Sequence, residues 1–419
     1  HRGGQAGGSA RHGSPPIEIP MRDVIVVGAS LAGLRAAEAL RHDGYDGRVT
    51  IVGAESHLPY DRPPLSKEVL SGRWSLEDIA LRPPERYQAL DAEWRLGVRA
   101  ESLHLGERRL ELDDGSYLDF DGLVVATGAA PRSLPGQPVE LPGLHTLRTI
   151  EDSLALSSEL EDPGARVVVV GAGFIGSEVA ATARGRGADV TVVETLASPL
   201  LGVLGQQMGE TCGRLHMDHG VSLRTGVGVE AIEGDRRVEA VRLADGSVLP
   251  ADIVVVGVGV SPSTDWLEGS GLEIANGVVC DARLFAAEGV VAAGDVARWH
   301  HRRLGEDLRV EHWTNATEQG TVAGHNLLVG RGAGEDYTPV PFFWSDQYGI
   351  KIQYVGHSRP DDQVVVVHGS MKERRFVAIY GRDGRLTGAL GFSRPRQLMT
   401  YRRLLAEQAS WEDALAAAD

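Results

Sequence analysis

The sequence predicts an α/β protein built from two copies of a βαβ unit and completed by a smaller α+β domain. Two glycine-rich turns, each between an apolar strand and a helix, predict the two units. A second repeat, later in each half, indicates that the halves are duplicates. The third part begins near Arg331, where the composition changes and aromatic residues gather at Phe342, Phe343, Trp344 and Tyr348.

The first unit lies between residues 24 and 55. Its strand, helix and second strand are expected at Val24–Val27, Leu31 to about His42, and Arg48–Val52. In the turn, Gly28 permits the tight bend, and Gly33 lets the helix pack closely on the strand, so that the first helical amides face a pyrophosphate. Glu55 follows Gly28 at a little beyond the usual interval of about twenty residues for the acid that binds a ribose hydroxyl. The pattern predicts an adenine dinucleotide. Because Ser30 replaces the middle glycine, a turn without a ligand is the alternative.

The second unit repeats this order with no glycine replaced. Its strands are expected at Val167–Val170 and Val190–Val193, with a helix between them that runs to about Arg186. The glycines of its turn and the acid that ends it are Gly171, Gly173, Gly176 and Glu194. Two such units predict two nucleotide sites, usually a flavin beside a nicotinamide.

A gapless repeat relates the two halves. DGSYLDFDGLVVATG at 114–128 corresponds to DGSVLPADIVVVGVG at 245–259, and each copy reads as a turn, a short strand and a buried strand. The glycine turns are spaced further apart than these copies, so the first half carries extra residues, which we place after Glu55. That stretch contains YDRPPLSK (60–67), whose prolines and cations make a stiff loop suited to an anionic or electron-rich ligand. A plain surface loop is the alternative.

Composition is that of an ordinary globular protein of two or three domains, with 419 residues of which 42% are hydrophobic and 24% charged. The net charge of −16 argues against generic binding to nucleic acid or to anionic membranes. No apolar run approaches the roughly 18 residues of a membrane helix, and no signal peptide is evident, so we expect a cytoplasmic protein. Residues 1–20, rich in Gly, Ser and Pro, are expected to form a flexible extension before Met21.

Cysteine usage excludes a dithiol relay. Cys212 and Cys280 are the only cysteines and cannot form a CxxC pair, nor can they alone assemble a thiolate metal site. The 14 histidines lack metal-ligand spacing, so we predict no bound metal.

Taken together, these motifs resemble those of the FAD-dependent, NADH-using ferredoxin reductases of oxygenase systems, in particular the putidaredoxin reductase type. The matching segments are GASLAG, YDRPPLSK, VVATGAAPR, GAGFIGSE, AAGDVA and FFWSDQY. The resemblance extends from Met21 to about the C-terminus. Two residues depart from it: Phe342 stands where relatives often have Trp, and Ser30 replaces a glycine found in some of them.

The resemblance implies a glutathione-reductase-like fold. A discontinuous FAD domain would span residues 21–130 and 251–330, with an NAD domain inserted at 131–250. Residues 331–419 would form the C-terminal α+β domain.

The resemblance also assigns site residues. On the FAD side it implies Gly28, Ser30, Gly33, Glu55, Arg62, Lys67, Thr127, Gly128 and Asp295. On the nicotinamide side it implies Gly171, Gly173, Gly176, Glu178, Glu194 and Gly259. Trp313 joins the cofactor-binding set, and the candidate catalytic residues are Lys67, Glu178 and Trp344.

The implied activity is hydride transfer from NADH to FAD, followed by single-electron transfer to a [2Fe–2S] ferredoxin that feeds an oxygenase. Some relatives place a redox-active cysteine after the first acid, but residues 56–80 contain none, so electrons must leave the flavin directly. The alternatives are a rubredoxin reductase, an NADH oxidase-like enzyme, and a flavoprotein with slight turnover that resembles apoptosis-inducing factor.

Charge refines the expected partners. Glu194 favours NADH over NADPH, because a carboxylate repels a 2′-phosphate and Thr195–Leu201 offers no cation to receive it. Nine basic residues against two acidic ones lie between Lys372 and Arg403, in a chain that is otherwise strongly acidic. A small acidic ferredoxin is therefore expected to dock on the C-terminal domain, at a site that includes Arg402 and Arg403.

Overall fold

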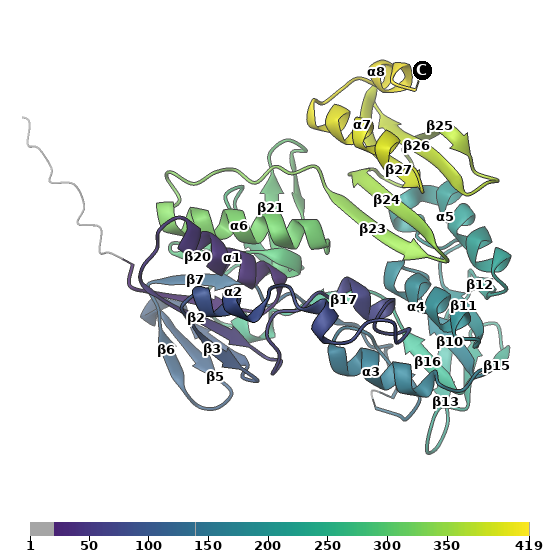
Figure 1. Ribbon diagram of the computed structural model, residues 1–419, viewed down its shortest axis with the longest axis horizontal. Coiled ribbons are helices and arrows are strands. Elements are labelled where there is room, and N and C mark those ends of the chain that lie inside the picture. Colours follow the sequence, from purple (N-terminus) through teal and green to yellow (C-terminus); the bar gives the residue numbers. More distant parts are fainter. Residues whose placement is uncertain (1–20, 139, 419) are drawn as a thin grey trace, which may run out of the picture.

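Two mainly parallel sheets and one antiparallel sheet organise the protein, as the computed structural model shows (Figure 1). The structure describes residues 21–138 and 140–418, so the extension predicted over residues 1–20 lies outside the described residues. The two βαβ units and the C-terminal α+β part are all present, which confirms the predicted fold class. Among the described helices, none combines the length and the apolar character that a bilayer crossing requires.

The first unit is built on a six-stranded sheet of order β19-β20-β7-β1-β2-β3. Central strand β1 pairs in parallel with β2 and β7 and is almost wholly buried, because helices α1 and α6 cover one face of the sheet and smaller strands the other. The elements are β1 (Asp23–Val27), α1 (Leu31–His42), β2 (Arg48–Gly53), β3 (Ala92–Leu96), β7 (Gly122–Val125), β19 (Phe285–Ala287), β20 (Val290–Ala292) and α6 (Trp313–Val329).

The second unit is a five-stranded sheet of order β12-β11-β10-β16-β9. Its elements are β9 (Leu144–His145), α3 (Ile150–Glu159), β10 (Arg166–Val170), α4 (Phe174–Gly185), β11 (Asp189–Glu194), α5 (Leu201–Asp218), β12 (Ser222–Thr225) and β16 (Ile253–Val256). The domain boundary predicted between residues 250 and 251 falls one strand too early, because β16 pairs with β10 in this sheet, as β7 pairs with β1 in the first.

Smaller sheets flank the two units. Each half carries an antiparallel meander, and a two-stranded ribbon of β8 and β17 joins the halves. The elements are β4 (Ala100–His104), β5 (Arg109–Leu112), β6 (Tyr117–Asp119), β8 (Ala129–Pro131), β13 (Val229–Glu233), β14 (Ala240–Leu243), β15 (Val248–Pro250), β17 (Val260–Pro262), β18 (Val278–Cys280), β21 (Ala297–His301) and β22 (Glu306–Leu308).

The extra residues of the first half lie where the sequence placed them. Residues 54–91 connect β2 to β3, whereas the shorter segment 195–221, mostly α5, connects β11 to β12. The longer connection contains a 3₁₀ turn, η1 (Pro63–Ser66), within the YDRPPLSK loop, and the short helix α2 (Pro84–Ala89).

The C-terminal domain is an antiparallel sheet of order β23-β24-β27-β26-β25, which lies beside α5 of the second unit (Figure 1). Arg374 pairs with Asp218 of α5 at 2.6 Å, and the buried Tyr380 hydroxyl donates to the Leu204 carbonyl at 3.0 Å. The elements are β23 (Phe342–Gln347), β24 (Ile350–Gly356), β25 (Gln363–Ser370), β26 (Arg375–Arg382), β27 (Arg385–Phe392), α7 (Pro395–Ala406) and α8 (Trp411–Ala416). Helix α7 begins two residues before the predicted start at Gln397.

Helices α1 and α6 pack together through residues with small side chains. A Cβ at Gly320 would lie 2.4 Å from the Ala32 carbonyl oxygen, and a Cβ at Gly324 would lie 2.5 Å from that of Ala36. Both distances are far below van der Waals contact with backbone that cannot rotate away. Glycine therefore fixes the spacing of these helices, and with it the position of the α1 N-terminus.

We expect Gly324→Ala to destabilise the protein by about 1–3 kcal/mol, because the added methyl group must push α6 away from α1. The measurement is the midpoint of thermal or urea unfolding. Gly332→Ala is the matched control, since its added methyl would meet nothing within 4 Å. Equal midpoints for the two variants would contradict this account of the helix contact.

Candidate functional site

A cavity of about 1160 Å³ lies where the three parts of the chain meet. Its walls include both glycine turns, the YDRPPLSK loop, the start of α6 and strand β23. It therefore touches every segment that carries the family resemblance.

Most of the predicted site residues line this cavity. They are Gly28, Ser30, Glu55, Arg62, Lys67, Thr127, Gly128, Gly173, Gly176, Glu178, Glu194, Gly259, Asp295, Trp313 and Trp344. Gly33 and Gly171 do not. A Cβ at Gly33 would lie 2.0 Å from the Gly28 carbonyl oxygen. Gly171 has a φ of +101°, and a Cβ there would collide with the backbone of Gly257. These two glycines allow close packing and a tight turn beneath the cavity wall.

Two helix N-termini open into the cavity. Ser30 and Gly173 are the N-cap residues of α1 and α4, and neither helix receives a side-chain cap. A Cβ at Gly173 would meet nothing within 4 Å, so the backbone there borders open space. Uncapped amides at the positive end of a helix dipole bind phosphate oxygens, which fits one dinucleotide at each turn.

Arg62 ties the loop to the end of the first unit. Its guanidinium donates to the Glu55 carboxylate at 2.6 Å and to the Arg148 carbonyl at 2.6 Å, while the Tyr60 hydroxyl also donates to Glu55. The prolines within η1 hold this part of the loop in one conformation. Each oxygen of the Glu55 carboxylate thus accepts one of these hydrogen bonds, which hold it at the cavity wall.

Arg148 is a site residue that the sequence analysis missed. It pairs with Asp295 through Nη2 and Oδ2 at 2.9 Å, and both side chains line the cavity. The one local signal is the Thr149–Asp152 capping box that starts α3 directly after it. Nothing in the sequence links Arg148 to Asp295, because their pairing depends on the return of the chain to the first sheet.

The carboxylate of Glu194 is held at the end of β11. It accepts from the Ala172 amide at 2.8 Å and from the Leu196 amide at 2.9 Å. These bonds fix the charge beside the second glycine turn. That location suits an acid that accepts from a ribose hydroxyl.

Lys67 and Glu178 form a buried ion pair in the cavity wall. The Nζ–Oε2 distance is 2.8 Å, and the two side chains are 10% and 4% exposed. Glu178 also accepts from the Ser66 hydroxyl, from the Ser345 hydroxyl at 2.8 Å and from the Asp346 amide at 3.3 Å. The pair therefore joins the loop of the first unit, helix α4 of the second and β23 of the C-terminal domain.

Aromatic side chains line the cavity beside α6. The Trp313 indole donates to Asp61 at 2.7 Å and lies edge-on to Trp344, with ring centres 5.9 Å apart. Trp344 in turn stacks near Phe342, and the Arg402 guanidinium lies 5.3 Å over the Phe342 ring. A continuous row of rings therefore runs from the cavity toward α7.

Two titratable groups of this region are shifted by burial. Burial raises the pKa of Asp61, although the Trp313 hydrogen bond opposes the shift. Burial lowers the pKa of His312 to about 4, so its ring is neutral near pH 7 and adds no positive charge to the cavity.

The basic residues of the C-terminal domain do not form one patch. Arg374 is paired with Asp218 near α5, and Arg382 is paired with Asp362 near the opposite ends of strands β25 and β26. Antiparallel strands send successive turns to opposite ends of a sheet, so residues close in sequence are separated. Arg402 on α7 lies over the Phe342 ring, is 38% exposed and is 3.9 Å from Glu318, while the next residue, Arg403, is 65% exposed and pairs with Glu407 at 3.2 Å.

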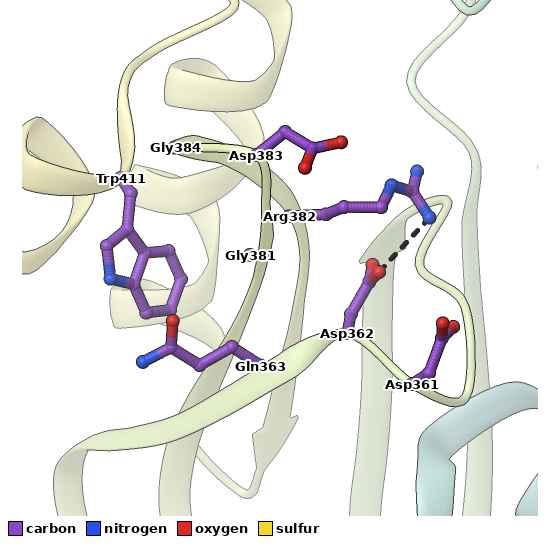
Figure 2. A pocket seen from close by; sticks show the side chains of 8 residues that line it. All are labelled: Asp361, Asp362, Gln363, Gly381, Arg382, Asp383, Gly384 and Trp411. Atoms are coloured by element: carbon purple, nitrogen blue, oxygen red, sulfur yellow. Dashed lines mark hydrogen bonds and ion pairs between the residues drawn. The ribbon is translucent and has the colours of Figure 1, made fainter.

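A second, smaller hollow of about 250 Å³ lies within the C-terminal domain (Figure 2). Its Asp362 carboxylate is already satisfied by Arg382 at 3.1 Å, by the Thr387 hydroxyl at 2.7 Å and by the Arg359 amide. The Trp411 indole fills the space over Gly381, where a Cβ would lie 2.3 Å from the ring. These contacts stabilise the domain.

Cysteine is absent from the walls of the large cavity, as far as the described residues define them. Cys212 and Cys280 are both buried elsewhere as free thiols. No thiol among the described residues can therefore relay electrons out of this cavity.

The chain matches two family profiles. The profile described as pyridine nucleotide-disulphide oxidoreductase matches residues 22–320, and that described as reductase C-terminal matches residues 342–419. Rhodocoxin reductase of Rhodococcus erythropolis is 36% identical, covering 92% of this chain and 90% of its own length. The ferredoxin–NAD(+) reductase component of the anthranilate 1,2-dioxygenase system of Burkholderia cepacia is 37% identical, covering 91% and 93%.

A solved structure extends these similarities to the fold. Putidaredoxin reductase, in its covalent complex with putidaredoxin, is similar with a TM-score of 0.89 and 32% identity, covering 95% of this chain and 96% of its own. The glutathione-reductase-like arrangement predicted from the motifs is thus confirmed.

We expect Glu178→Leu to lower the free energy of unfolding by about 3–5 kcal/mol, because it leaves the Lys67 ammonium buried without its partner. Adding Lys67→Met should recover much of this loss, since the pair becomes apolar at similar volume. Urea unfolding with FAD in excess measures both effects. A double variant as unstable as Glu178→Leu alone would contradict the buried pair.

Proposed function

The chain belongs to the pyridine nucleotide-disulphide oxidoreductase family, and from this premise we propose that it is an NADH-dependent ferredoxin reductase that contains FAD and serves an oxygenase. One observation carries the proposal. A single cavity receives two uncapped helix N-termini, and no thiol among the described residues lines it. Two dinucleotides can meet there, and the electrons have no disulfide to pass through.

Bound FAD supplies the chemistry, because it accepts a hydride and releases electrons singly. The residues around the first glycine turn would hold it. The α1 N-terminus with Ser30 would bind the pyrophosphate, and Glu55 would accept from the adenosine ribose. Asp295, oriented by Arg148 at 2.9 Å, would accept from the ribityl chain, and Arg62 would keep Glu55 in place.

The second glycine turn would hold the nicotinamide dinucleotide. The α4 N-terminus at Gly173 would bind its pyrophosphate, and Glu194 would accept from its ribose 2′-hydroxyl. Glu178, on the second turn of α4, reaches the wall where the two sites meet and pairs with Lys67 of the first unit. This pair would orient the two rings and exclude water from between them.

The aromatic row would lead to the partner. Trp344 and Phe342 are half-buried, and Arg402 of α7, with Arg403 next to it in sequence, lies over the Phe342 ring. We place the docking face of a small acidic [2Fe–2S] ferredoxin here, because an acidic carrier would be repelled by most of this chain. The wider basic region predicted from sequence is thereby narrowed to this face.

We propose a matching division into domains. The FAD domain would comprise residues 21–130 and 257–330, the nicotinamide domain residues 131–256, and the C-terminal domain the remainder. We also propose a cytoplasmic location, because NADH is the intended electron donor.

Anaerobically purified protein should carry FAD and catalyse NADH-dependent reduction of cytochrome c only when a [2Fe–2S] ferredoxin is present. A panel of [2Fe–2S] ferredoxins and rubredoxins tests this. Faster turnover with a rubredoxin would indicate a rubredoxin reductase instead. Faster turnover with oxygen alone would indicate an NADH oxidase-like enzyme.

NADH should be preferred over NADPH, and Glu194→Arg should shift the ratio of the two kcat/KM values toward NADPH by roughly tenfold or more, about 1.4 kcal/mol. Arginine removes the repulsion and offers the 2′-phosphate a partner. Glu230→Arg on exposed β13 makes the same charge change away from the cavity and should leave the ratio alone. An unshifted ratio in Glu194→Arg would remove this residue from the cofactor site.

Reversing the charges of Arg402 and Arg403 to Glu should raise the KM for ferredoxin roughly tenfold and flatten its salt dependence. NADH-dependent ferricyanide reduction should not change, since that small oxidant needs no docking face. Lys372→Glu, in the turn between β25 and β26, is the control for altered charge. Unchanged ferredoxin kinetics in the α7 variant, or an equal effect in the control, would place the docking face elsewhere.

A further inference from the structure

Strand β23 is held at its two ends by different units. The Thr314 hydroxyl of α6 donates to the Phe342 carbonyl at 2.6 Å where the strand begins. Just past its end, the Tyr348 hydroxyl lies 2.7 Å from Nδ1 of the buried His216 on α5. These contacts fix the strand across the cavity between the first and second units.

The two faces of β23 look in different directions. Burial alternates along the strand: Ser345 and Gln347 are fully buried, whereas Trp344 and Asp346 are half-buried. Consecutive side chains of a strand point to opposite faces. The strand therefore presents Trp344 to the aromatic row and Ser345 to the Lys67–Glu178 pair.

Ser345 sits in a directed chain of hydrogen bonds. The Gln347 side-chain amide donates to the Ser345 oxygen at 3.1 Å, which leaves the Ser345 hydroxyl proton to donate to Glu178 Oε1 at 2.8 Å. Lys67 donates to the other carboxylate oxygen, Oε2, at 2.8 Å. The first unit therefore binds one oxygen of the carboxylate, and the C-terminal domain binds the other.

Without the Ser345 hydroxyl, Oε1 would keep only the Asp346 amide at 3.3 Å. Such a long bond is weak, so only Oε2 would still be held firmly, by Lys67 and Ser66, and Oε1 would lose its fixed position. A buried hydrogen bond to a charged acceptor is among the stronger ones, so its loss has a measurable effect.

We propose that Ser345, oriented by Gln347, is a positioning residue for the reaction with NADH, and that through it the C-terminal domain completes the nicotinamide–flavin site. The inference rests on the proposed function. Ser345 fixes the orientation of the Glu178 carboxylate. Glu178 in turn fixes the position of the Lys67 ammonium, at the point where the two dinucleotides would meet. The domain assigned to ferredoxin docking therefore also takes part in the first half-reaction.

The test compares Ser345→Val, which loses the hydroxyl, with Ser345→Thr, which keeps the hydroxyl in a side chain of the same shape and volume as valine. The measurement is the rate constant for reduction of bound FAD by NADH in anaerobic stopped-flow, alongside FAD content and the Kd for NADH. Val should slow flavin reduction roughly tenfold or more with FAD content unchanged, and Thr should restore most of the rate. Ser177→Ala is the matched control, because Ser177 is a fully buried hydroxyl next to Glu178 in sequence that has no hydrogen-bond partner among the described residues.

Unchanged flavin reduction in Ser345→Val, or a Thr variant as slow as the Val variant, would overturn the proposal. If Ser345→Val does not retain FAD, Gln347→Leu decides instead, since it disorients the Ser345 hydroxyl without removing it and should slow the same step. Gln347→Leu at the parent rate would then overturn the proposal. Failure of the parent protein to be reduced by NADH would instead refute the proposed function.

Discussion

The buried carboxylate of Glu178 is the constraint on which the rest of the site depends. It lies on α4 and accepts hydrogen bonds from Ser66 and Lys67 of the first unit and from Ser345 of β23. A buried charge is tolerated only when its partners stay in place, so this residue fixes the three parts of the chain relative to one another. The cavity of about 1160 Å³ lies between these three parts, with Glu178 in its wall.

Duplication provides the symmetry of the site, and one longer connection breaks it. Each βαβ unit directs an uncapped helix N-terminus into the cavity. The connection from β2 to β3 carries Tyr60, Arg62 and Lys67, whereas the corresponding connection in the second unit is mostly helix α5. Similar folds thus acquire different chemistry, because the longer connection of the first unit brings the cations Arg62 and Lys67 to the shared cavity, whereas the second unit contributes the carboxylates of Glu178 and Glu194.

Sequence reasoning succeeded where the determinants are local. Strand, turn and helix follow directly from the apolar runs around Gly28 and Gly171, and the repeat ending at Gly259 located β16 even though the predicted domain boundary did not. It failed where a contact joins distant segments. The Arg148–Asp295 and Ser345–Glu178 contacts link residues more than a hundred positions apart, and no local pattern encodes them. The basic residues from Lys372 to Arg403 are close together in sequence. They are separated in the structure because successive turns of an antiparallel sheet lie at opposite ends of it.

No thiol among the described residues lines the cavity. Electrons that reach a bound flavin must therefore pass directly to the partner protein. The most direct test is an anaerobic titration of the FAD-loaded protein with NADH, followed by addition of oxidised [2Fe–2S] ferredoxin, with flavin absorbance recorded throughout. The account predicts that NADH bleaches the flavin and that ferredoxin restores its absorbance as the iron–sulfur centre becomes reduced. A flavin that NADH does not bleach, or that stays bleached in the presence of every ferredoxin tried, would contradict it.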